Sequence, residues 1–536
     1  MLARVRLLIF VLPVWMALGL PSPARAVEAP KIVQKDGRFA LLVDGRPYLI
    51  LGAQINNSSS WPATLPKVWP AIADMHANTV EAPVYWEQIE PRPGTFDFAN
   101  VDTLVQQARD HHVHLVLLWF GTWKNGQMHY APAWVKTNPA QYPRMINSHG
   151  EPIDVLSANS SVNRDADKAA FVALTRHLQK IDGEQHTILL MQVENESGAI
   201  GTVRDFSAMA NKEFAGQVPA RLVSALHKQP GTWSQVFGPD ADETFQAWYQ
   251  ARYINAIVQA GKVEFNIPMY VNVWVSYPAA ELPERRVTFP GINYPSGGPV
   301  QKMIDLWKVA APAIDMIGPD IYSDDSGFYR ELLRTYRRPD NPLWIPETGS
   351  GDSFAKFFFY ALGEGAIGFS PFGVDRTGWT YSGDAGPKAH AENYALIAPM
   401  DRQIAELNFE GKLKTAVEEP GAAQQELDFG AWQATVAFGF PQHDGRRPPG
   451  TPDFHGRALV AQLGPNEFLV TGIDASVSFH LPSRLAGQRM NIVQAEQGNY
   501  VDGKWQPLRI LNGDQTDRGL IFKHDGQVVH VTLAKF

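Results

Sequence analysis

Short apolar runs alternate along this chain with longer stretches in which apolar residues recur every three to four positions. The short runs are rich in β-branched and aromatic residues, which is typical of strands buried on both faces. They lie at 48–55, 78–86, 113–120, 187–194, 268–274, 314–322, 343–347 and 366–370. Helical periodicity fills intervals between them, at 65–76, 101–111, 166–181, 242–263, 327–337 and 354–363. Eight strands with intervening helices predict an α/β fold, the (β/α)8 barrel.

The pattern changes after a last helical stretch at 389–407. Polar and apolar residues then alternate in segments punctuated by Gly, Pro and Asp-Gly, at 425–439, 457–481, 489–500 and 519–536. This alternation predicts an antiparallel β-sandwich, with the Pro- and Gly-rich stretch 443–450 as a surface loop. Because 536 residues exceed what a barrel needs, we expect two domains. The boundaries are residues 27–408 for the barrel, with short strands before it, and 409–536 for the sandwich. The sandwich either binds polysaccharide or supports the barrel, and we favour support.

The first residues carry the features of a secretory signal peptide. Arg4 and Arg6 precede an apolar run at 7–20, and Ala24-Arg25-Ala26 supplies small residues where a signal peptidase reads. We expect cleavage after Ala26, and a periplasmic or secreted protein without a membrane anchor. An uncleaved anchor is the alternative, but the run is short for a span. The chain contains no Cys, so it forms no disulfides.

Composition narrows the class of function. A net charge of −8 without a basic stripe argues against nucleic acid as a partner. The dense histidine cluster His111, His112 and His114 lies at the junction before the third strand. This is the barrel face opposite the one formed by the C-terminal strand ends. The cluster therefore indicates a solvated turn rather than a metal site. The glycine-rich runs lack the Lys-Ser/Thr of a phosphate loop. We therefore expect no metal and no cofactor.

Carboxyl groups stand at the ends of two predicted strands. The fourth strand leads into Asn195 and Glu196, and the seventh ends in Glu347. In a (β/α)8 barrel the C-terminal strand ends form the active face, and strands four and seven lie opposite one another across the mouth. Taken alone, a Glu at a strand end is often only a helix cap or the partner in an ion pair. Two carboxyl groups at this placement predict glycoside hydrolysis, with Asn195 beside them to bind a substrate hydroxyl.

Several longer motifs resemble one glycosidase family. They are Gly45 to Gln54, the run Trp86-Glu87-Gln88-Ile89-Glu90-Pro91-Arg92-Pro93-Gly94-Thr95-Phe96-Asp97-Phe98, the Trp-rich segment from Trp123 to Trp134, Gln192-Val193-Glu194-Asn195-Glu196-Ser197-Gly198, and Pro346-Glu347-Thr348-Gly349. Together they resemble glycoside hydrolase family 35, the β-galactosidases, within the retaining (β/α)8 clan. Thr122 and Ser197 depart from the Glu and Tyr that many relatives carry there, so the sugar preference is less fixed than the chemistry.

The resemblance implies a retaining exo-glycosidase that removes terminal non-reducing β-D-galactosyl residues from oligosaccharides or polysaccharide fragments. Glu196 would be the acid/base and Glu347 the nucleophile. Tyr322 either donates a hydrogen bond to Glu347 or packs on the barrel rim. Asn195 would hold the 2-hydroxyl group. The walls of the sugar site are expected to include Tyr85, Trp123 and Glu81, together with Trp86, Trp119 and Trp274 near other strand tips.

Two alternatives remain open. A related glycosidase could act on another sugar, such as a β-glucoside or an α-L-arabinopyranoside, which shares the ring geometry of galactose but lacks C6. A carbohydrate-binding protein could keep the barrel and lack turnover. In each case the partner is a carbohydrate, and the sequence does not determine the oligomeric state.

Overall fold

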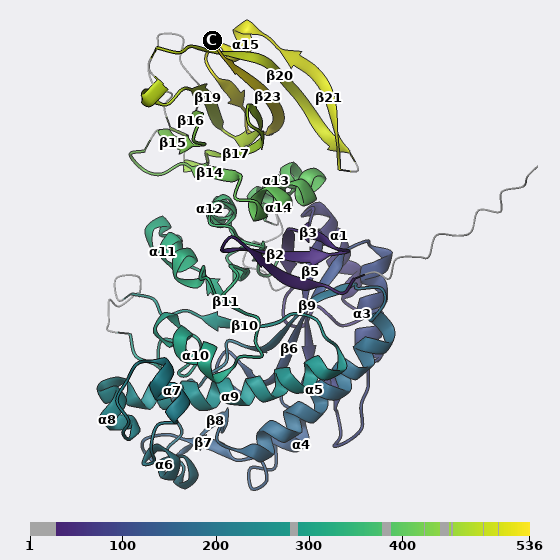
Figure 1. Ribbon diagram of the computed structural model, residues 1–536. Coiled ribbons are helices and arrows are strands. Elements are labelled where there is room, and N and C mark those ends of the chain that lie inside the picture. Colours follow the sequence, from purple (N-terminus) through teal and green to yellow (C-terminus); the bar gives the residue numbers. More distant parts are fainter. Residues whose placement is uncertain are drawn as a thin grey trace, which may run out of the picture.

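The computed structural model describes residues 28–278, 288–377, 387–422, 424–439, 450–451, 454–485, 487–501 and 503–536. The predicted signal peptide and nearly all of the predicted loop 443–450 lie outside these ranges. Figure 1 shows a helix-wrapped barrel, with the C-terminal strands stacked above one flank of it. Within the described ranges, no helix is both long and apolar enough to span a bilayer.

The predicted barrel is confirmed. Eight parallel strands close on themselves, and nearly every residue in them is buried. Such burial explains why they appear in the sequence as continuous apolar runs. The strands are β4 (Ile50–Gln54), β5 (Thr79–Tyr85), β6 (His114–Lys124), β9 (Ile188–Asn195), β10 (Met269–Trp274), β11 (Met316–Ile321), β12 (Ile345–Thr348) and β13 (Gly368–Pro371).

Helices surround the barrel close to their predicted positions. The larger ones are α1 (Leu65–Asp74), α3 (Ala99–Asp110), α5 (Ser161–Asp182), α9 (Ala241–Glu264), α10 (Ile304–Ala310), α11 (Ser326–Tyr336) and α12 (Phe357–Gly363). Shorter elements between them are α2 (Trp86–Ile89), α4 (Ala133–Lys136), β7 (Arg144–Ile146), β8 (Pro152–Leu156), α6 (Ala208–Phe214), α7 (Ala220–Ala225) and α8 (Trp233–Phe237).

The helix predicted at 389–407 is two helices, and this corrects the prediction. α13 (Lys388–Ile397) and α14 (Asp401–Phe409) are joined by the 3-10 turn Ala398–Met400. Pro399 lies in that turn. Proline has no backbone N–H and its ring clashes with the preceding turn, so it ends the first helix.

A small antiparallel sheet closes the N-terminal end of the barrel. It consists of β1 (Lys31–Lys35), β2 (Arg38–Val43) and β3 (Arg46–Tyr48). Leu41 and Val43 of this sheet are fully buried in one cluster with barrel residues such as Val116 and Trp344. The barrel interior is therefore packed from below, and the described part of the barrel opens at the C-terminal strand ends.

The predicted sandwich is also confirmed. One sheet contains β14 (Leu413–Val417), β17 (Arg457–Gly464), β18 (Glu467–Ile473), β23 (Gln527–Lys535), β20 (Met490–Val501) and β21 (Lys504–Leu511). The other contains β15 (Gln424–Asp428), β16 (Gln433–Phe438), β19 (Ala475–His480) and β22 (Leu520–Phe522), and a short helix, α15 (Gly513–Thr516), precedes β22. Aromatic residues including Trp432, Phe438 and Phe522 fill the space between the sheets.

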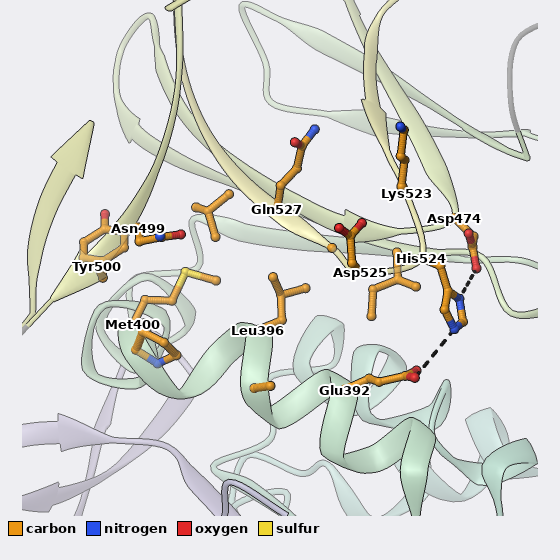
Figure 2. Close-up of a pocket in the computed structure, with 15 residues that line it drawn as sticks. Glu392, Leu396, Met400, Asp474, Asn499, Tyr500, Lys523, His524, Asp525 and Gln527 are labelled. Carbon is orange, nitrogen blue, oxygen red and sulfur yellow. Dashed lines mark hydrogen bonds and ion pairs between the residues drawn. The ribbon is translucent and has the colours of Figure 1, made fainter. Parts of the chain in front are cut away.

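The sandwich rests on the last barrel helices. The buried guanidinium group of Arg457 donates to Asn393 Oδ1 of α13 at 2.6 Å. A hollow of about 810 Å³ lies between α13 and the loop 523–526. Figure 2 shows the His524 ring at its edge, between Asp474 at 2.8 Å and Glu392 of α13 at 3.6 Å. Polar and ionic contacts thus attach the sandwich to the flank of the barrel, away from its mouth.

Candidate active site

A cavity of about 700 Å³ lies at the C-terminal ends of the barrel strands. This volume is within the usual range for sites that bind small molecules. Its wall combines carboxyl, amide and aromatic side chains with the glycine-rich segment after β12. The lining residues are Asn57, Lys124, Asn125, Glu196, Trp274, Tyr277, Asn293, Asp320, Tyr322, Glu347, Gly349, Ser350, Gly351, Phe354 and Phe372.

The two predicted catalytic carboxyl groups meet in this cavity. Glu196 follows β9 and Glu347 lies on β12, and each is only 6% exposed. One oxygen of each lies within 4.8 Å of the other. Retaining glycosidases place their two carboxyl groups about 5 to 5.5 Å apart, whereas inverting enzymes need about 6.5 to 9.5 Å to admit a water. The spacing therefore fits direct attack by one carboxylate and proton donation by the other.

Two donors hold the Glu347 carboxylate. The Tyr322 hydroxyl donates to Oε1 at 2.6 Å, and Gln54 Nε2 donates to Oε2 at 3.0 Å. Of the two roles predicted for Tyr322, the structure contains the hydrogen bond, with the ring still 41% exposed at the rim. Hydrogen bonds to a charged group are strong and directional. The two bonds fix the orientation of the Glu347 carboxylate, as a displacement reaction requires of its nucleophile.

A backbone hydrogen bond holds Glu196 in place, and the surroundings of its side chain raise its pKa. Its N–H donates to Asn272 Oδ1 at 2.8 Å, and its φ of 44° turns the chain out of the strand. Burial, and next the charge of Glu347, raise the pKa of Glu196 to about 7, against smaller opposing effects of Lys124 and Asp320. A carboxyl group with this pKa keeps its proton at mildly acidic pH and begins to lose it only near neutrality, as suits a general acid.

A second pair of buried carboxyl groups supports the tip of β9. Glu194 Oε2 accepts from the N–H of Trp123 at 2.6 Å, and Asp167 Oδ1 accepts from Trp119 Nε1 at 2.9 Å. Burial raises the pKa of both carboxyl groups, and the two are hydrogen-bonded to each other. They join α5 and β9 to β6 just below the two predicted catalytic residues.

Two of the predicted sugar ligands lie behind the cavity wall. Asn195 is fully buried, and its amide group is engaged with Gln192, Asn272 and Asn125 at 3.1 to 3.3 Å. Glu81 is buried inside the barrel and accepts from the Tyr270 hydroxyl at 3.1 Å; burial raises its pKa well above the usual range. Their predicted contacts with substrate therefore stay predictions.

Two of the predicted aromatic wall residues, Tyr85 and Trp123, are also buried. Tyr85 stacks on Phe120 with ring centroids 5.9 Å apart. Trp123 packs edge-on against Tyr253 at 4.5 Å. Neither lines the cavity. Its aromatic surface comes from Trp274, which was expected in the wall, and from Tyr277 and Phe372, which were not. Stacking of Tyr85 or Trp123 on a sugar likewise stays a prediction.

Sequence reasoning missed several polar residues of the site, and three of them lie close to the carboxyl pair. Gln54 ends the first barrel strand, Lys124 ends the third, and Asp320 stands two positions before Tyr322. In a strand, residues two positions apart point to the same side. The choice of Tyr322 as a site residue thus contained a signal for Asp320.

Three carboxyl groups of the site, those of Glu196, Asp320 and Glu347, could approach one metal ion, since one oxygen of each lies within 4.8 Å of the others. Both oxygens of Glu347 and one of Asp320 already accept hydrogen bonds from protein donors. Among the residues that the structure describes, nothing further indicates a cation.

Comparison with known proteins identifies two family models along the chain. Residues 59–289 match glycoside hydrolase family 42, described as Beta-galactosidase. Residues 390–523 match a domain of unknown function, DUF5597. The first match supports the predicted resemblance at the level of β-galactosidases of the (β/α)8 glycosidase clan, and it names family 42 where the motifs suggested family 35.

Curated relatives carry a similar description. The chain is 25% identical over 245 residues to a "Beta-galactosidase" of Xanthomonas manihotis, a match covering 40% of this chain and 39% of that protein. It is 26% identical over 211 residues to "Beta-galactosidase 14" of Arabidopsis thaliana, covering 37% of this chain and 22% of that protein. The chain thus matches well under half the length of either relative.

A solved structure shares the fold over most of both chains. It is titled as a β-galactosidase from Bacillus circulans sp. alkalophilus, with a TM-score of 0.50 and 11% sequence identity. The match covers 90% of this chain and 99% of that chain. At this identity the likeness concerns the fold alone: a barrel followed by β-sheets.

Proposed function

We propose that this protein is a retaining exo-β-galactosidase that hydrolyses terminal non-reducing β-D-galactosyl residues of oligosaccharides or polysaccharide fragments. The observation that carries the proposal is the pair of buried carboxyl groups of Glu196 and Glu347, with oxygen atoms within 4.8 Å at the mouth of the barrel. The family model and both relatives, each described as a β-galactosidase, support the choice of sugar.

The reaction proceeds by double displacement. In the first step the Glu347 carboxylate attacks the anomeric carbon while Glu196 gives its proton to the glycosidic oxygen. The bond to the leaving group breaks, and a glycosyl ester of Glu347 forms. In the second step ionised Glu196 takes a proton from water, which attacks the same carbon and releases the sugar and Glu347.

The two protonation states of Glu196 follow from the charge of its neighbour. Before the reaction the negative charge of Glu347 raises the pKa of Glu196. Once Glu347 is esterified that charge is gone, so Glu196 becomes more acidic and stays ionised as the base of the second step. One pair of carboxyl groups thus serves both halves of the reaction.

Which glycoside hydrolase family the chain belongs to is a separate and more specific proposal. We propose membership of family 35, supported by the segment from Gln192 to Gly198 and by the run from Trp86 to Phe98. The family model that matches the chain is that of family 42. Both assignments lead to the same reaction, and the test below does not depend on which holds.

The test is hydrolysis of nitrophenyl glycosides by the mature protein. We expect β-galactoside to be hydrolysed faster than β-glucoside or α-L-arabinopyranoside. Glu196→Gln should lower kcat by about 10² to 10⁴-fold, and Glu347→Gln at least as much. Glu426→Gln, on β15 of the sandwich, is the matched control and should leave kcat unchanged. Full activity of Glu347→Gln would refute the mechanism, and preference for another glycoside would change the sugar.

Two further readouts separate catalysis from binding alone. A 2-deoxy-2-fluoro-galactoside with a good leaving group should trap the glycosyl ester, and the mass increase should map to the peptide that contains Glu347. Proton NMR of the first product should show the β-anomer, because two displacements restore the configuration. Galactose binding without turnover would instead identify a carbohydrate-binding protein.

We also propose that the protein is exported to the periplasm or the medium. Support comes from Arg4, Arg6, the apolar run 7–20 and the small residues Ala24 and Ala26. N-terminal sequencing of protein from the periplasm of a bacterial host should begin at Val27. Recovery of an uncleaved chain in the membrane fraction would contradict export in this form.

A further inference from the structure

The site contains one more carboxyl group than double displacement uses. Asp320 on β11 is the register partner of Glu347 on β12 and is 1% exposed. Register partners of adjacent parallel strands point to the same side of the sheet. Asp320 therefore faces the cavity together with Glu347, and one oxygen of each lies within 4.8 Å of Glu196.

The hydrogen bonds of Asp320 indicate where its proton sits. Asn272 Nδ2 donates to Oδ2 at 2.7 Å, so Oδ2 is an acceptor. Oδ1 is buried and receives no donor from any described residue. The carboxyl groups of Asp320 and Glu196 are hydrogen-bonded to each other. Two carboxyl groups form such a bond only when one of them carries a proton, and Oδ1 of Asp320 is free to carry it.

The charges around Asp320 favour its neutral form. Glu347 faces it from β12, Glu196 from β9 and Lys124 from β6, while Asn272 of β10 is neutral. Three tyrosines, Tyr270, Tyr322 and Tyr336, also lie within the electrostatic reach of Asp320, and a charge on Asp320 raises their pKa values. One cation cannot balance three buried carboxylates. Burial and the charge of Glu347 raise the pKa of Asp320 well above its ordinary value.

We infer that Asp320 is a positioning residue that keeps its proton and donates it, as a hydrogen bond, to Glu196. This inference rests on the proposed function. With one Glu196 oxygen occupied by the Asp320 hydroxyl, the acidic proton of Glu196 resides on the other oxygen, toward the leaving group. After that proton is transferred, the same hydrogen bond stabilises the Glu196 carboxylate. Asp320 neither gains nor loses a proton in either step.

Asp320→Asn is the conservative variant, because an amide can reproduce both contacts. Its oxygen would accept from Asn272 Nδ2, and its NH₂ group would donate to Glu196. We expect kcat within a few-fold of wild type and an unchanged alkaline limb of kcat/KM, near the Glu196 pKa of about 7. If Asp320 were ionised, Asp320→Asn would remove a negative charge beside Glu196 and move that limb to lower pH, which would overturn the inference.

Asp320→Ala removes the donor. We expect kcat to fall about 10- to 100-fold, the usual effect of losing a hydrogen bond to a charged group. The alkaline limb should move to higher pH, because the bond that favours ionised Glu196 is gone. A purely structural role would lower the folded fraction without moving the limb. An Asp320→Ala enzyme with the wild-type profile would refute the inference, and Asp428→Asn on exposed β15 is the control.

A readout without turnover keeps this inference separate from the proposed function. Infrared spectra of protein with ¹³C-labelled aspartate carboxyl groups distinguish Asp320 from Glu196. Wild type minus Asp320→Asn should show one protonated aspartate carboxyl group near neutral pH, whether or not galactosides are hydrolysed. A difference spectrum that shows only ionised aspartate there would overturn the inference even if the enzyme proves to be a β-galactosidase.

Discussion

At the scale of single residues, the raised pKa that suits Glu196 to its proposed role as general acid has a cost in stability. Its pKa is raised from 4.5 to about 7 in the folded protein, chiefly by burial. The folded state therefore prefers the protonated form. This contribution to stability is complete below pH 4.5 and is lost as the pH rises through about 7. Conditions in which Glu196 must ionise are conditions that destabilise the fold.

Glu196→Gln should therefore be more stable than wild type at alkaline pH. Glutamine cannot ionise, so the difference in Tm between variant and wild type should be small at pH 4.5, should grow as the pH rises from 4.5 to about 7, and should stay constant above that. Thermal denaturation of both proteins at acid and alkaline pH measures it. The same difference at both pH values would contradict the raised pKa, and Glu184→Gln is the exposed control.

Tyr322→Phe tests the contact with Glu347, the proposed nucleophile. The variant loses the 2.6 Å hydrogen bond to Glu347 Oε1. Bonds to charged groups contribute about 1.5 to 3 kcal/mol, so kcat should fall about 10- to 100-fold. Tm should change little, since the ring is 41% exposed. Tyr500→Phe, in the sandwich, should leave kcat alone. An unchanged kcat in Tyr322→Phe would show that Gln54 alone orients Glu347.

The site was predictable where a strand ends and unpredictable where every position is buried. Glu196, Glu347 and Tyr322 line the cavity as the strand tips indicated. Trp123 and Glu81 lie on strands whose residues are almost all buried, so polarity cannot distinguish the inside of the barrel from its outside. Positive φ values at Glu194 and Glu196 add a local turn that no alternation rule contains.

At the scale of elements, the extended end of β6 positions much of the site. Gly121 lies where β6 passes the buried carboxyl pair. A Cβ there would collide with Trp119 Nε1 and lie 2.8 Å from oxygen atoms of Asp167 and Glu194. Only glycine lets this strand approach the pair so closely. The end of β6 then delivers Lys124 to the cavity.

Gly121→Ala should therefore lower both Tm and kcat. The methyl group must displace Trp119 or part the carboxyl pair, and overpacking of this kind costs about 1 to 3 kcal/mol. Circular dichroism melting and steady-state kinetics give the two readouts. Gly513→Ala is the control, since the nearest atom to its Cβ would be 3.8 Å away. Wild-type values in Gly121→Ala would mean that β6 has room to shift.

Element positions were predictable to within a few residues. The short continuous apolar runs of the strands differ clearly from the helical stretches, in which apolar residues recur every three to four positions. All eight barrel strands were present in the sequence as apolar runs. The short α2 and α4, of four residues each, contain too few turns to show a period. Pro399 divided a continuous helical pattern into α13 and α14. The signal for that break was in the sequence, since proline interrupts helices.

At the scale of the whole molecule, the barrel and the sandwich are joined by buried contacts. Arg457 of the sandwich is 2% exposed and donates to Asn393 of α13. Burial lowers the pKa of Arg457 to about 10, so its charge persists at neutral pH. A buried charge that loses its acceptor destabilises the fold strongly. The two domains should therefore unfold together.

We expect one calorimetric transition for the wild type. Asn393→Ala should lower Tm by several degrees, because it removes a hydrogen bond to a buried guanidinium group. Asn499→Ala, which lines the hollow in Figure 2, is the control and should leave Tm unchanged. Two separate transitions in the wild type would show that the domains are energetically independent.

The small sheet of β1 to β3, which closes the N-terminal end of the barrel, has a consequence for the products of the reaction. Leu41 and Val43 close the barrel from below, so every molecule enters and leaves through the mouth. In the proposed reaction, water must arrive at the glycosyl ester by the route along which the leaving group departs. An alcohol or a second sugar in that passage competes with water for the same carbon. The ratio of transglycosylation to hydrolysis therefore measures how freely the mouth exchanges its contents during the lifetime of the ester.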